Sequence, residues 1–287
     1  MAKATIGVIG GSGLYQMEGL TDVEEVDVVT PFGVPSDTIV TGALEGVGVA
    51  FLPRHGKGHR LSPTELPVRA NIYALKSLGV ERIISVSAVG SLREELRPLD
   101  FVVPDQLINR TTSRIETFFG DGIVGHVGLA DPFCPELSAS LLEAAGAEGM
   151  TVHKGGTYLV MEGPQFSTKA ESVLYRSWGA SIIGMTALPE AKLAREAEMC
   201  YATLASVTDY DVWHETEGPV TVEMVVANLM HNVDNAKKIL RHLIPRFSPT
   251  RECLCKEALK NAIITSPEHI SEETKERLRL IIAKYIQ

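Results

Sequence analysis

Short apolar runs recur along this chain, and each ends in glycine or small polar residues. Ile6 to Ile9 is closed by Gly10-Gly11-Ser12-Gly13, and Arg82 to Val86 is followed by Ser87-Ala88-Val89-Gly90-Ser91. From Pro67 to Leu243, runs of this kind alternate with stretches whose apolar residues have helical spacing. Such alternation predicts an α/β fold with a largely parallel sheet.

Apolar spacing and turn residues give the expected bounds of the elements. Strands are expected at 38–44, 47–52, 82–86, 101–103, 157–161, 181–183 and 201–207. Helices are expected at 67–78, 135–149, 168–178, 189–198 and 220–243, with two more in the tail, 251–287, split near Ser266-Pro267. No linker precedes Pro245, so we expect one domain at 1–245 and a helical C-terminal extension at 246–287 that packs on it.

The charge and hydropathy of the chain exclude several classes of protein. Its 27 Lys and Arg against 36 Asp and Glu give a net charge of −9, which argues against a nucleic-acid partner. No apolar run approaches the length of about 20 residues that crosses a membrane. The N-terminus enters a strand-like segment without the features of a signal peptide, so we expect a cytoplasmic protein with no membrane association.

Three strand ends carry groups suited to anions. Glycines and the Ser12 hydroxyl follow the first strand, Arg54-His55-Gly56 follows another, and Ser87 begins a third such segment. Alone, the glycine-rich segment is more typical of a plain tight turn, and Arg54-His55-Gly56 is also compatible with a solvated basic loop. The first is not a dinucleotide fingerprint because Gln16 stands where glycine is required. Because open α/β sheets bind ligands at the carboxyl ends of strands, the three together favour a phosphate or nucleotide-like site.

Other strand ends carry groups suited to a flat base. Glu162 and Phe166 follow one strand, and Thr208-Asp209-Tyr210-Asp211 follows another. An aromatic ring can stack on a base, and a carboxylate can accept from an amine or deliver a proton to a ring nitrogen. The alternative for the Asp-Tyr-Asp segment is an ordinary turn.

The four cysteines predict no metal site. Cys134 and Cys200 lie in apolar contexts typical of buried free thiols. Cys253-Leu254-Cys255 brings two thiols close in sequence, but a zinc site needs more ligands and no second such pair is present. An oxidised pair, as in intracellular proteins of hyperthermophiles, is the alternative.

In this order, the strand-end motifs resemble the purine nucleoside phosphorylase superfamily. The matching segments are GVIGGSGL, TPFGVPSD, PRHGKGH, SAVGSLREE, ADPFCP, MEGPQFST, GMTALPEAKLAREAEMCYA and TDYDVW. They span about Ile6 to Leu243 and are most similar to members that cleave S-methyl-5′-thioadenosine. The resemblance implies a mixed sheet or distorted barrel flanked by helices, assembled as a homotrimer or a dimer of trimers.

The resemblance also assigns residues to two halves of one site. Phosphate would be bound by Ser12, Arg54, His55, Ser87, Ala88 and Thr186. Ser12 and Ser87 stand where relatives can carry threonine, which keeps the hydroxyl. The nucleoside would be bound by Phe166, Ser167, Met185, Asp209, Asp211, Val222 and Val225, and by His126 reaching into the neighbouring subunit's pocket. Among these, Asp209 would lie near purine N7 as the catalytic proton donor, Asp211 near the 6-amino group and Met185 beneath the ribose.

The implied activity is phosphorolysis of S-methyl-5′-thioadenosine to adenine and 5-methylthioribose 1-phosphate, a pentosyl transfer in methionine and purine salvage. Orthophosphate is a co-substrate, and no cofactor or metal is expected. The alternatives are a purine nucleoside phosphorylase acting on adenosine, inosine, guanosine or methylthioinosine, and a nucleoside-binding module without turnover.

The cysteine pattern is similar to that of thermophilic members that carry disulfides. The resemblance implies a Cys253–Cys255 disulfide and a second one between Cys134 and Cys200.

Overall fold

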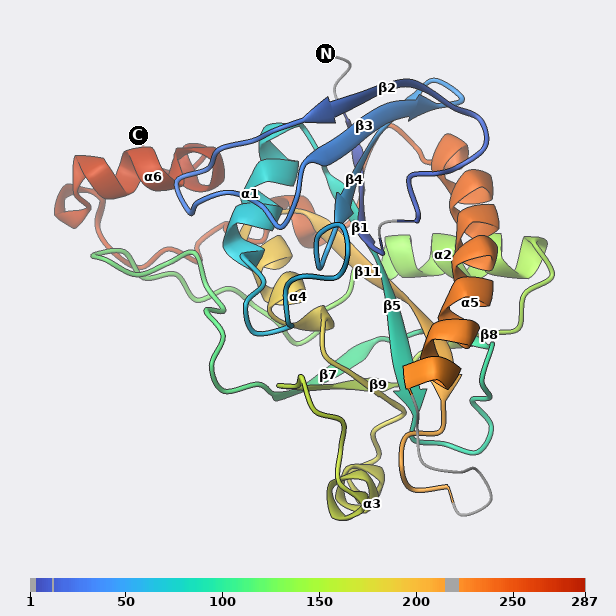
Figure 1. The fold of residues 1–287 in the computed structure, drawn as a ribbon. Helices are drawn as coiled ribbons and strands as arrows, with labels where there is room; N and C mark the ends of the chain where they lie inside the picture. The colour runs from blue at the N-terminus through green and yellow to red at the C-terminus, as the bar shows by residue number, and fades with distance from the viewer. Residues whose placement is uncertain (1–3, 12, 215–221, 287) are drawn as a thin grey trace.

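A central mixed sheet with helices on both sides forms the body of the protein (Figure 1). The computed structural model describes residues 4–11, 13–214 and 222–286, and of 222–227 and 229 it describes the backbone alone. Helices α2 and α5 cover one side of the sheet, while α1, α4 and α6 lie on the other (Figure 1). The chain therefore forms the α/β architecture that the sequence predicts.

The described strands are β1 (Ile6–Gly10), β2 (Leu20–Val26), β3 (Ile39–Leu44), β4 (Val47–Pro53), β5 (Arg82–Ser91), β6 (Phe101–Val103), β7 (Gln106–Arg110), β8 (Val152–Lys154), β9 (Thr157–Met161), β10 (Ile182–Gly184) and β11 (Cys200–Asp209). The α-helices are α1 (Val68–Ser77), α2 (Pro135–Ala147), α3 (Lys169–Ser177), α4 (Ala187–Glu196), α5 (Val222–Leu243) and α6 (Glu272–Ile282). Short 3₁₀ turns are η1 (Ile244–Arg246), η2 (Leu254–Glu257) and η3 (Pro267–His269).

Four parallel strands place the predicted motifs at one edge of the sheet. β1 pairs in parallel with β4 and β5, and β5 pairs in parallel with β11. The register places Gly10 opposite Pro53, and the amide of Arg54 donates to the Gly10 carbonyl at 2.9 Å. Because these strands run the same way, the residues after β1 and β4 and at the ends of β5 and β11 lie at a common edge.

Several expected elements are confirmed. The turn between β3 and β4 has Glu45 and Gly46 both at positive φ, as a two-residue hairpin requires. Helix α3 begins with the predicted capping box, in which Thr168 and Glu171 satisfy each other's amides.

Parallel pairs predominate among the described strands, as expected, but the sheet is mixed. β10 runs antiparallel to β5, β6 antiparallel to β11, and β2, β3 and β4 form an antiparallel meander. The mixed sheet implied by the family resemblance is what the structure shows. Strand β2 was not predicted because it lies at the exposed edge of the sheet. Its side chains are mostly polar and exposed, so they form no apolar pattern.

The small-residue segment Ser87 to Ser91, predicted to end a strand, forms the second half of β5. β5 continues to Ser91 because these residues pair with β11.

The C-terminal tail differs from expectation. Its first half forms only the 3₁₀ turns η2 and η3, and α6 is the one α-helix described in it, capped by Ser271.

The tail packs onto the body of the protein through both apolar cores. Leu278 and Ile282 of α6 join the cluster around α1 and α4, while Cys253 and Cys255 join the cluster around α2 and α5. Neither implied disulfide is present, since all four cysteines are free. Cys200 and Cys253, which were not expected to pair, have sulfurs 3.3 Å apart, within hydrogen-bonding distance. Folding brings the tail to β11, a long-range contact that the short Cys253–Cys255 spacing did not reveal.

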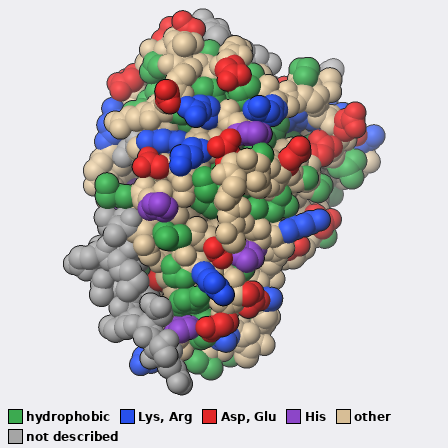
Figure 2. All heavy atoms as spheres, turned by 90° about the vertical axis from the view of Figure 1, so that its right-hand side faces the viewer, with side chains coloured by type: hydrophobic (Ala, Val, Ile, Leu, Met, Phe, Trp, Pro, Cys, Tyr) green, Lys and Arg blue, Asp and Glu red, His purple; other side chains and the backbone are tan. Residues whose placement is uncertain are grey.

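The surface matches the acidic composition. On the face that carries α2 and α5, Lys and Arg side chains are interspersed with Asp and Glu rather than gathered into one basic patch (Figure 2). Among the described residues, we find no helix with the length and apolar character to cross a membrane.

Candidate active site

Arg54, which follows β4, is buried in an ion pair with Glu190 of α4. Its Nε lies 2.6 Å from Glu190 Oε1, and Nη2 donates to Ser85 Oγ at 2.7 Å. Nη1 donates to the Val86 carbonyl at 2.9 Å. Burial lowers the pKa of the guanidinium, but the Glu190 charge raises it by a larger amount, so Arg54 stays charged. The described partners leave one Nη1 proton for a ligand, because a guanidinium carries five N–H donors.

A chain of hydroxyls leads from Arg54 to two other predicted phosphate ligands. Ser85 Oγ lies 3.4 Å from Ser87 Oγ, which lies 3.0 Å from Thr186 Oγ1. Thr186 precedes α4, but its side chain makes no capping hydrogen bond. Arg54, Ser87 and Thr186 therefore line one polar track, and Ala88 follows Ser87 on β5.

His55 is held as a neutral imidazole. Its Nδ1 lies 2.8 Å from the Leu61 carbonyl, which can only accept, so Nδ1 carries the proton and Nε2 is an acceptor. Its ring stacks on that of His59, with centroids 4.2 Å apart. Burial, followed by the Arg54 charge, lowers the pKa of His55 to about 4. At neutral pH the residue can accept a hydrogen bond from a protonated phosphate oxygen.

This lowered pKa predicts an acid-dependent loss of stability. Unfolded His55 takes up a proton near its ordinary pKa of about 6.5, whereas folded His55 does so only near pH 4. The free energy of unfolding should therefore fall as the pH drops from about 6.5 to about 4. We expect His55→Gln to flatten this slope in urea titrations, and the exposed-site control His269→Gln to leave it unchanged. Equal slopes in the wild type and His55→Gln would contradict the assignment.

Asp209 and Asp211 lie together at the end of β11. Asp209 Oδ1 accepts from the Asp211 amide at 2.8 Å, and Oδ2 lies 2.7 Å from Thr208 Oγ1. Both carboxyls are 8% exposed. Gly90 of β5 makes room for this arrangement, because a Cβ there would lie 3.0 Å from Asp209 Oδ1.

Both carboxyls have raised pKa values. Burial raises the pKa of Asp209 by more than the hydrogen bonds of Thr208 and of the Asp211 amide lower it. Burial also raises the pKa of Asp211. In the described structure, Asp211 Oδ2 is buried and accepts no well-formed hydrogen bond, although the hydroxyls of Ser172 and Ser167 lie close enough to lower the pKa of this carboxyl. A ligand that brings a donor to this atom would satisfy it.

Two asparagines of α5 position the end of β11, and the sequence reading did not identify them. Asn228 Nδ2 donates to the Thr208 carbonyl at 2.7 Å, and Asn232 Nδ2 donates to the Val207 carbonyl at 3.2 Å. These bonds fix the backbone just before Asp209. An asparagine on the inner face of a long apolar helix was the available signal, because buried amides need partners.

Arg114 is a third residue that the sequence analysis did not identify. Its side chain is 3% exposed, and Nη1 donates to the carbonyls of Met185 and Leu188 at 2.5 and 2.6 Å. Its Nε pairs with Glu162 Oε1 at 3.1 Å. Arg114 thus joins the loop after β9 to the loop after β10, which carries Met185.

The Glu162 carboxylate takes part in the same loop contacts as Arg114. Besides Arg114, its carboxylate accepts from the amides of Thr112 and Ser113 and from Thr64. Burial raises the pKa of Glu162, but these hydrogen bonds lower it by a larger amount, so that the pKa falls to about 2. The carboxylate that the sequence placed beside Phe166 therefore holds loops together.

The remaining predicted residues differ in placement. Phe166 is 48% exposed, so its ring is available for stacking, and Ser167 beside it is half-buried with Oγ 3.5 Å from Met161 Sδ. His126 lies on a separate long loop, and its backbone amide donates a hydrogen bond to the Ala262 carbonyl in the tail at 2.8 Å. Ser12 and the side chains of Val222 and Val225 lie outside the described residues.

One pocket opens between the loop before α1 and Arg114. It is lined by Phe32, Pro63, Thr64, Leu66, Pro67, Val68, Arg69, Ala70, Ser113, Arg114, Ile115 and Pro189. None of the predicted ligand-binding residues lines it, so we place the site at the strand ends, where the polar groups converge.

Residues 5–245 match the sequence pattern of the phosphorylase superfamily. This chain belongs to the phosphorylase superfamily.

Relatives across the superfamily match nearly the whole chain. S-methyl-5′-thioadenosine phosphorylase of Geobacter sulfurreducens is 60% identical over 285 residues, which cover 99% of this chain and 100% of that protein. The Koribacter versatilis protein of the same name is 59% identical, over 99% of this chain and 97% of its own.

Solved structures give the same result. A methylthioadenosine phosphorylase from an antarctic soil metagenomic library is 53% identical with a TM-score of 0.94, covering 98% of this chain and 99% of that one. A variant of the Schistosoma mansoni adenosine/methylthioadenosine phosphorylase, in complex with methylthioadenosine, is 36% identical with a TM-score of 0.81 over 91% of this chain and 97% of its own. The nucleoside phosphorylase fold expected from the sequence is confirmed.

Proposed function

We propose that this phosphorylase cleaves S-methyl-5′-thioadenosine with orthophosphate, releasing adenine and 5-methylthioribose 1-phosphate. The observation that carries this function is the convergence of two groups at one sheet edge. The polar track of Arg54, Ser87 and Thr186 suits phosphate, and the buried pair Asp209 and Asp211 suits a base. Relatives of that name match nearly the full chain. The reaction belongs to methionine and purine salvage in the cytoplasm.

The phosphate half acts as nucleophile and stabiliser together. Loss of the base leaves a cationic, oxocarbenium-like sugar, and an anion beneath C1′ stabilises this charge as it attacks. Hydroxyls at Ser87 and Thr186, one Arg54 N–H and neutral His55 are the described groups for binding it. Phosphate is the only co-substrate required, and the proposal includes no metal or cofactor at this site.

The base half supplies a proton. The purine gains negative charge as the glycosidic bond breaks, so protonation at N7 lowers the barrier. Thr208 Oγ1 lies 3.2 Å from the Val89 carbonyl and 2.7 Å from Asp209 Oδ2. One hydroxyl proton cannot fully serve both acceptors, and a protonated Asp209 that donates to Thr208 resolves the conflict. Burial, which raises the pKa of Asp209, favours that form.

Asp211 gives the preference for a 6-amino purine. Its buried Oδ2 is an acceptor for an exocyclic N–H, whereas a 6-oxo group would place two acceptors against each other.

The proposed function is tested by measuring free base from methylthioadenosine, adenosine, inosine, guanosine and methylthioinosine, with and without phosphate. We expect phosphate-dependent release that is fastest for methylthioadenosine. Preference for a 6-oxo nucleoside would instead indicate an inosine- or guanosine-cleaving enzyme. Failure of phosphate to release base from any of the five would contradict phosphorolysis altogether.

Exchange of Asp211 should change base selectivity. In Asp211→Asn the amide can both accept and donate, so the 6-amino preference should fall by about 10- to 100-fold in kcat/KM ratio, corresponding to about 1–3 kcal/mol. The measurement compares methylthioadenosine with methylthioinosine. Asp22→Asn, on the exposed edge strand β2, is the matched control and should keep the wild-type ratio. An unchanged ratio in Asp211→Asn would remove this residue from base recognition.

We also propose that the enzyme is a homotrimer or a dimer of trimers. Apolar side chains stand exposed on and after α3, with Val173 60%, Leu174 46% and Trp178 46% exposed. His126 is exposed on a long loop, as expected of a residue that serves a neighbouring subunit's 5′ pocket. Light scattering should give a mass of three or six chains, and His126→Ala should raise the KM for methylthioadenosine. A fully active monomer would contradict both statements.

A further inference from the structure

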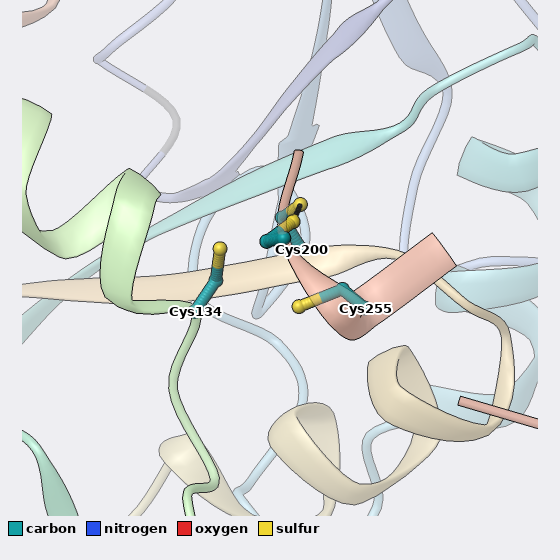
Figure 3. Close-up of side chains that lie close together, drawn as sticks. Cys134, Cys200 and Cys255 are labelled. Carbon is teal, nitrogen blue, oxygen red and sulfur yellow. Dashed lines mark hydrogen bonds between the residues drawn. The ribbon is translucent and has the colours of Figure 1, made fainter. Parts of the chain in front are cut away.

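All four cysteines of the protein lie in one buried cluster, far from the strand ends. Their sulfurs are within 4.8 Å of one another. Cys134 precedes α2, Cys200 opens β11, and Cys253 and Cys255 stand at the start of η2 (Figure 3). Three segments distant in sequence therefore contribute thiols to a single point in the fold.

The spacing of the sulfurs fits a tetrahedral metal site. A Zn–S bond of about 2.3 Å implies sulfurs about 3.8 Å apart in a regular tetrahedron. The observed sulfurs lie between 3.3 Å, for Cys200 and Cys253, and the limit of 4.8 Å, so they bracket this separation.

The surroundings suit the negative charge of a metal–thiolate centre. Arg251 Nη1 lies 3.9 Å from Cys200 Sγ and also donates to the Glu198 carbonyl, which fixes its position. Arg195 is close enough to interact electrostatically with Cys255, although the neighbouring Cys200 thiol and burial raise the pKa of Cys255 overall, and the N-terminus of α2 begins directly after Cys134. Two cations and a helix N-terminus thus face the cluster, which offsets part of the cost of burying an anionic centre.

We propose that Cys134, Cys200, Cys253 and Cys255 bind one Zn²⁺ ion at a closed structural site. Four sulfur ligands fill the tetrahedral shell and leave no position for water or substrate, as in structural rather than catalytic zinc centres. Binding replaces four S–H bonds by four Zn–S bonds and releases four protons, leaving a centre of charge −2. No electron is transferred.

The site would attach the tail to the body of the protein. Cys253 and Cys255 belong to the tail, while Cys200 belongs to the central strand β11 and Cys134 to the start of α2. Cys200 and Asp209 stand at opposite ends of β11, about 30 Å apart at about 3.3 Å per residue. Zinc should therefore stabilise the fold without taking part in the reaction, so this inference is independent of the proposed function.

The first test is the metal content of protein purified under reducing conditions. We expect about one zinc per chain by elemental analysis, and four thiols in protein denatured with a chelator. Removing the zinc from native protein should lower the Tm by several degrees, and added Zn²⁺ should restore it. Disulfides in place of zinc, or protein isolated without metal whose Tm does not change when Zn²⁺ is added, would overturn the proposal.

Substitutions of the proposed ligands test which residues bind the metal. Cys134→Ser and Cys255→Ser, in different segments, should each lose most of the bound zinc. His59→Ala is the control, because the stacked His55 and His59 rings are another pair of nitrogen ligands. It should keep one zinc per chain. Zinc that persists in both cysteine variants but is lost in His59→Ala would assign the metal to the histidines and sink the proposal.

A spectroscopic test needs no variant. Co²⁺ added to metal-free wild-type protein should give sulfur-to-cobalt charge-transfer bands and the intense d–d bands of a tetrahedral thiolate site. Zn²⁺ should then displace it. A weak octahedral spectrum would exclude coordination by four thiolates, and iron in the isolated protein would reassign the site to that metal.

Discussion

Asp209→Asn is expected to lower kcat for methylthioadenosine by about 10²- to 10⁴-fold, the usual contribution of a positioned general acid. An amide can keep the contacts to Thr208 and to the Asp211 amide, but it cannot transfer a proton to N7. The substituted side chain is nearly the same size, so the fold should survive. Steady-state rates with saturating phosphate give the comparison.

Two measurements separate proton donation from general damage at this position. Phosphate affinity should stay within a few-fold of wild type, because Asp209 lies on the base side. A 7-methylated purine nucleoside already carries positive charge on the base and needs no proton at N7, so the variant should lose far less activity with it. Equal losses on methylated and unmethylated substrates would contradict the role of Asp209 as acid.

The edge at which the site lies could be predicted from the sequence. Ligand-binding groups that follow parallel strands must meet at one edge, and the strand ends near Arg54, Ser87 and Asp209 were each visible as apolar runs closed by polar residues. The local pattern was sufficient because parallel pairing, rather than any particular contact, brings these ends together.

The partners that position the site could not be predicted. Glu190 and Arg54 are 136 residues apart, and Arg114 reaches Met185 across 71 residues. Spacing along the chain carries no information about such contacts. The cysteine cluster was missed for the same reason, since a ligand count over nearby residues sees only Cys253 and Cys255, and the other two thiols arrive through β11 and α2.

Removing the charge of Glu190 is expected to produce the largest loss of stability. Glu190→Ala leaves the Arg54 guanidinium buried without its counter-ion, which costs about 3–5 kcal/mol in the free energy of unfolding. Glu190 also accepts from Tyr201 at 2.9 Å, a bond that Glu190→Gln can keep. The glutamine variant should therefore lose less. Urea denaturation at one fixed protein concentration measures both, because subunit association also contributes to apparent stability.

The exposed pair Lys57–Glu25 provides the control, because its atoms are 3.0 Å apart yet both side chains are at least half exposed. Glu25→Ala should cost less than about 1 kcal/mol, since water screens a surface pair. If burial of an unpaired charge is the cause, replacing both partners, as in Arg54→Met with Glu190→Leu, should recover much of the stability lost in Glu190→Ala. That double variant would lose phosphate binding all the same. Stability and activity would then separate, and the result would show that the buried ion pair is kept for the position of Arg54 at the phosphate site rather than for the stability of the fold. A Glu190→Ala variant no less stable than Glu25→Ala would show that Arg54 finds other compensation, and the argument for the pair would fail.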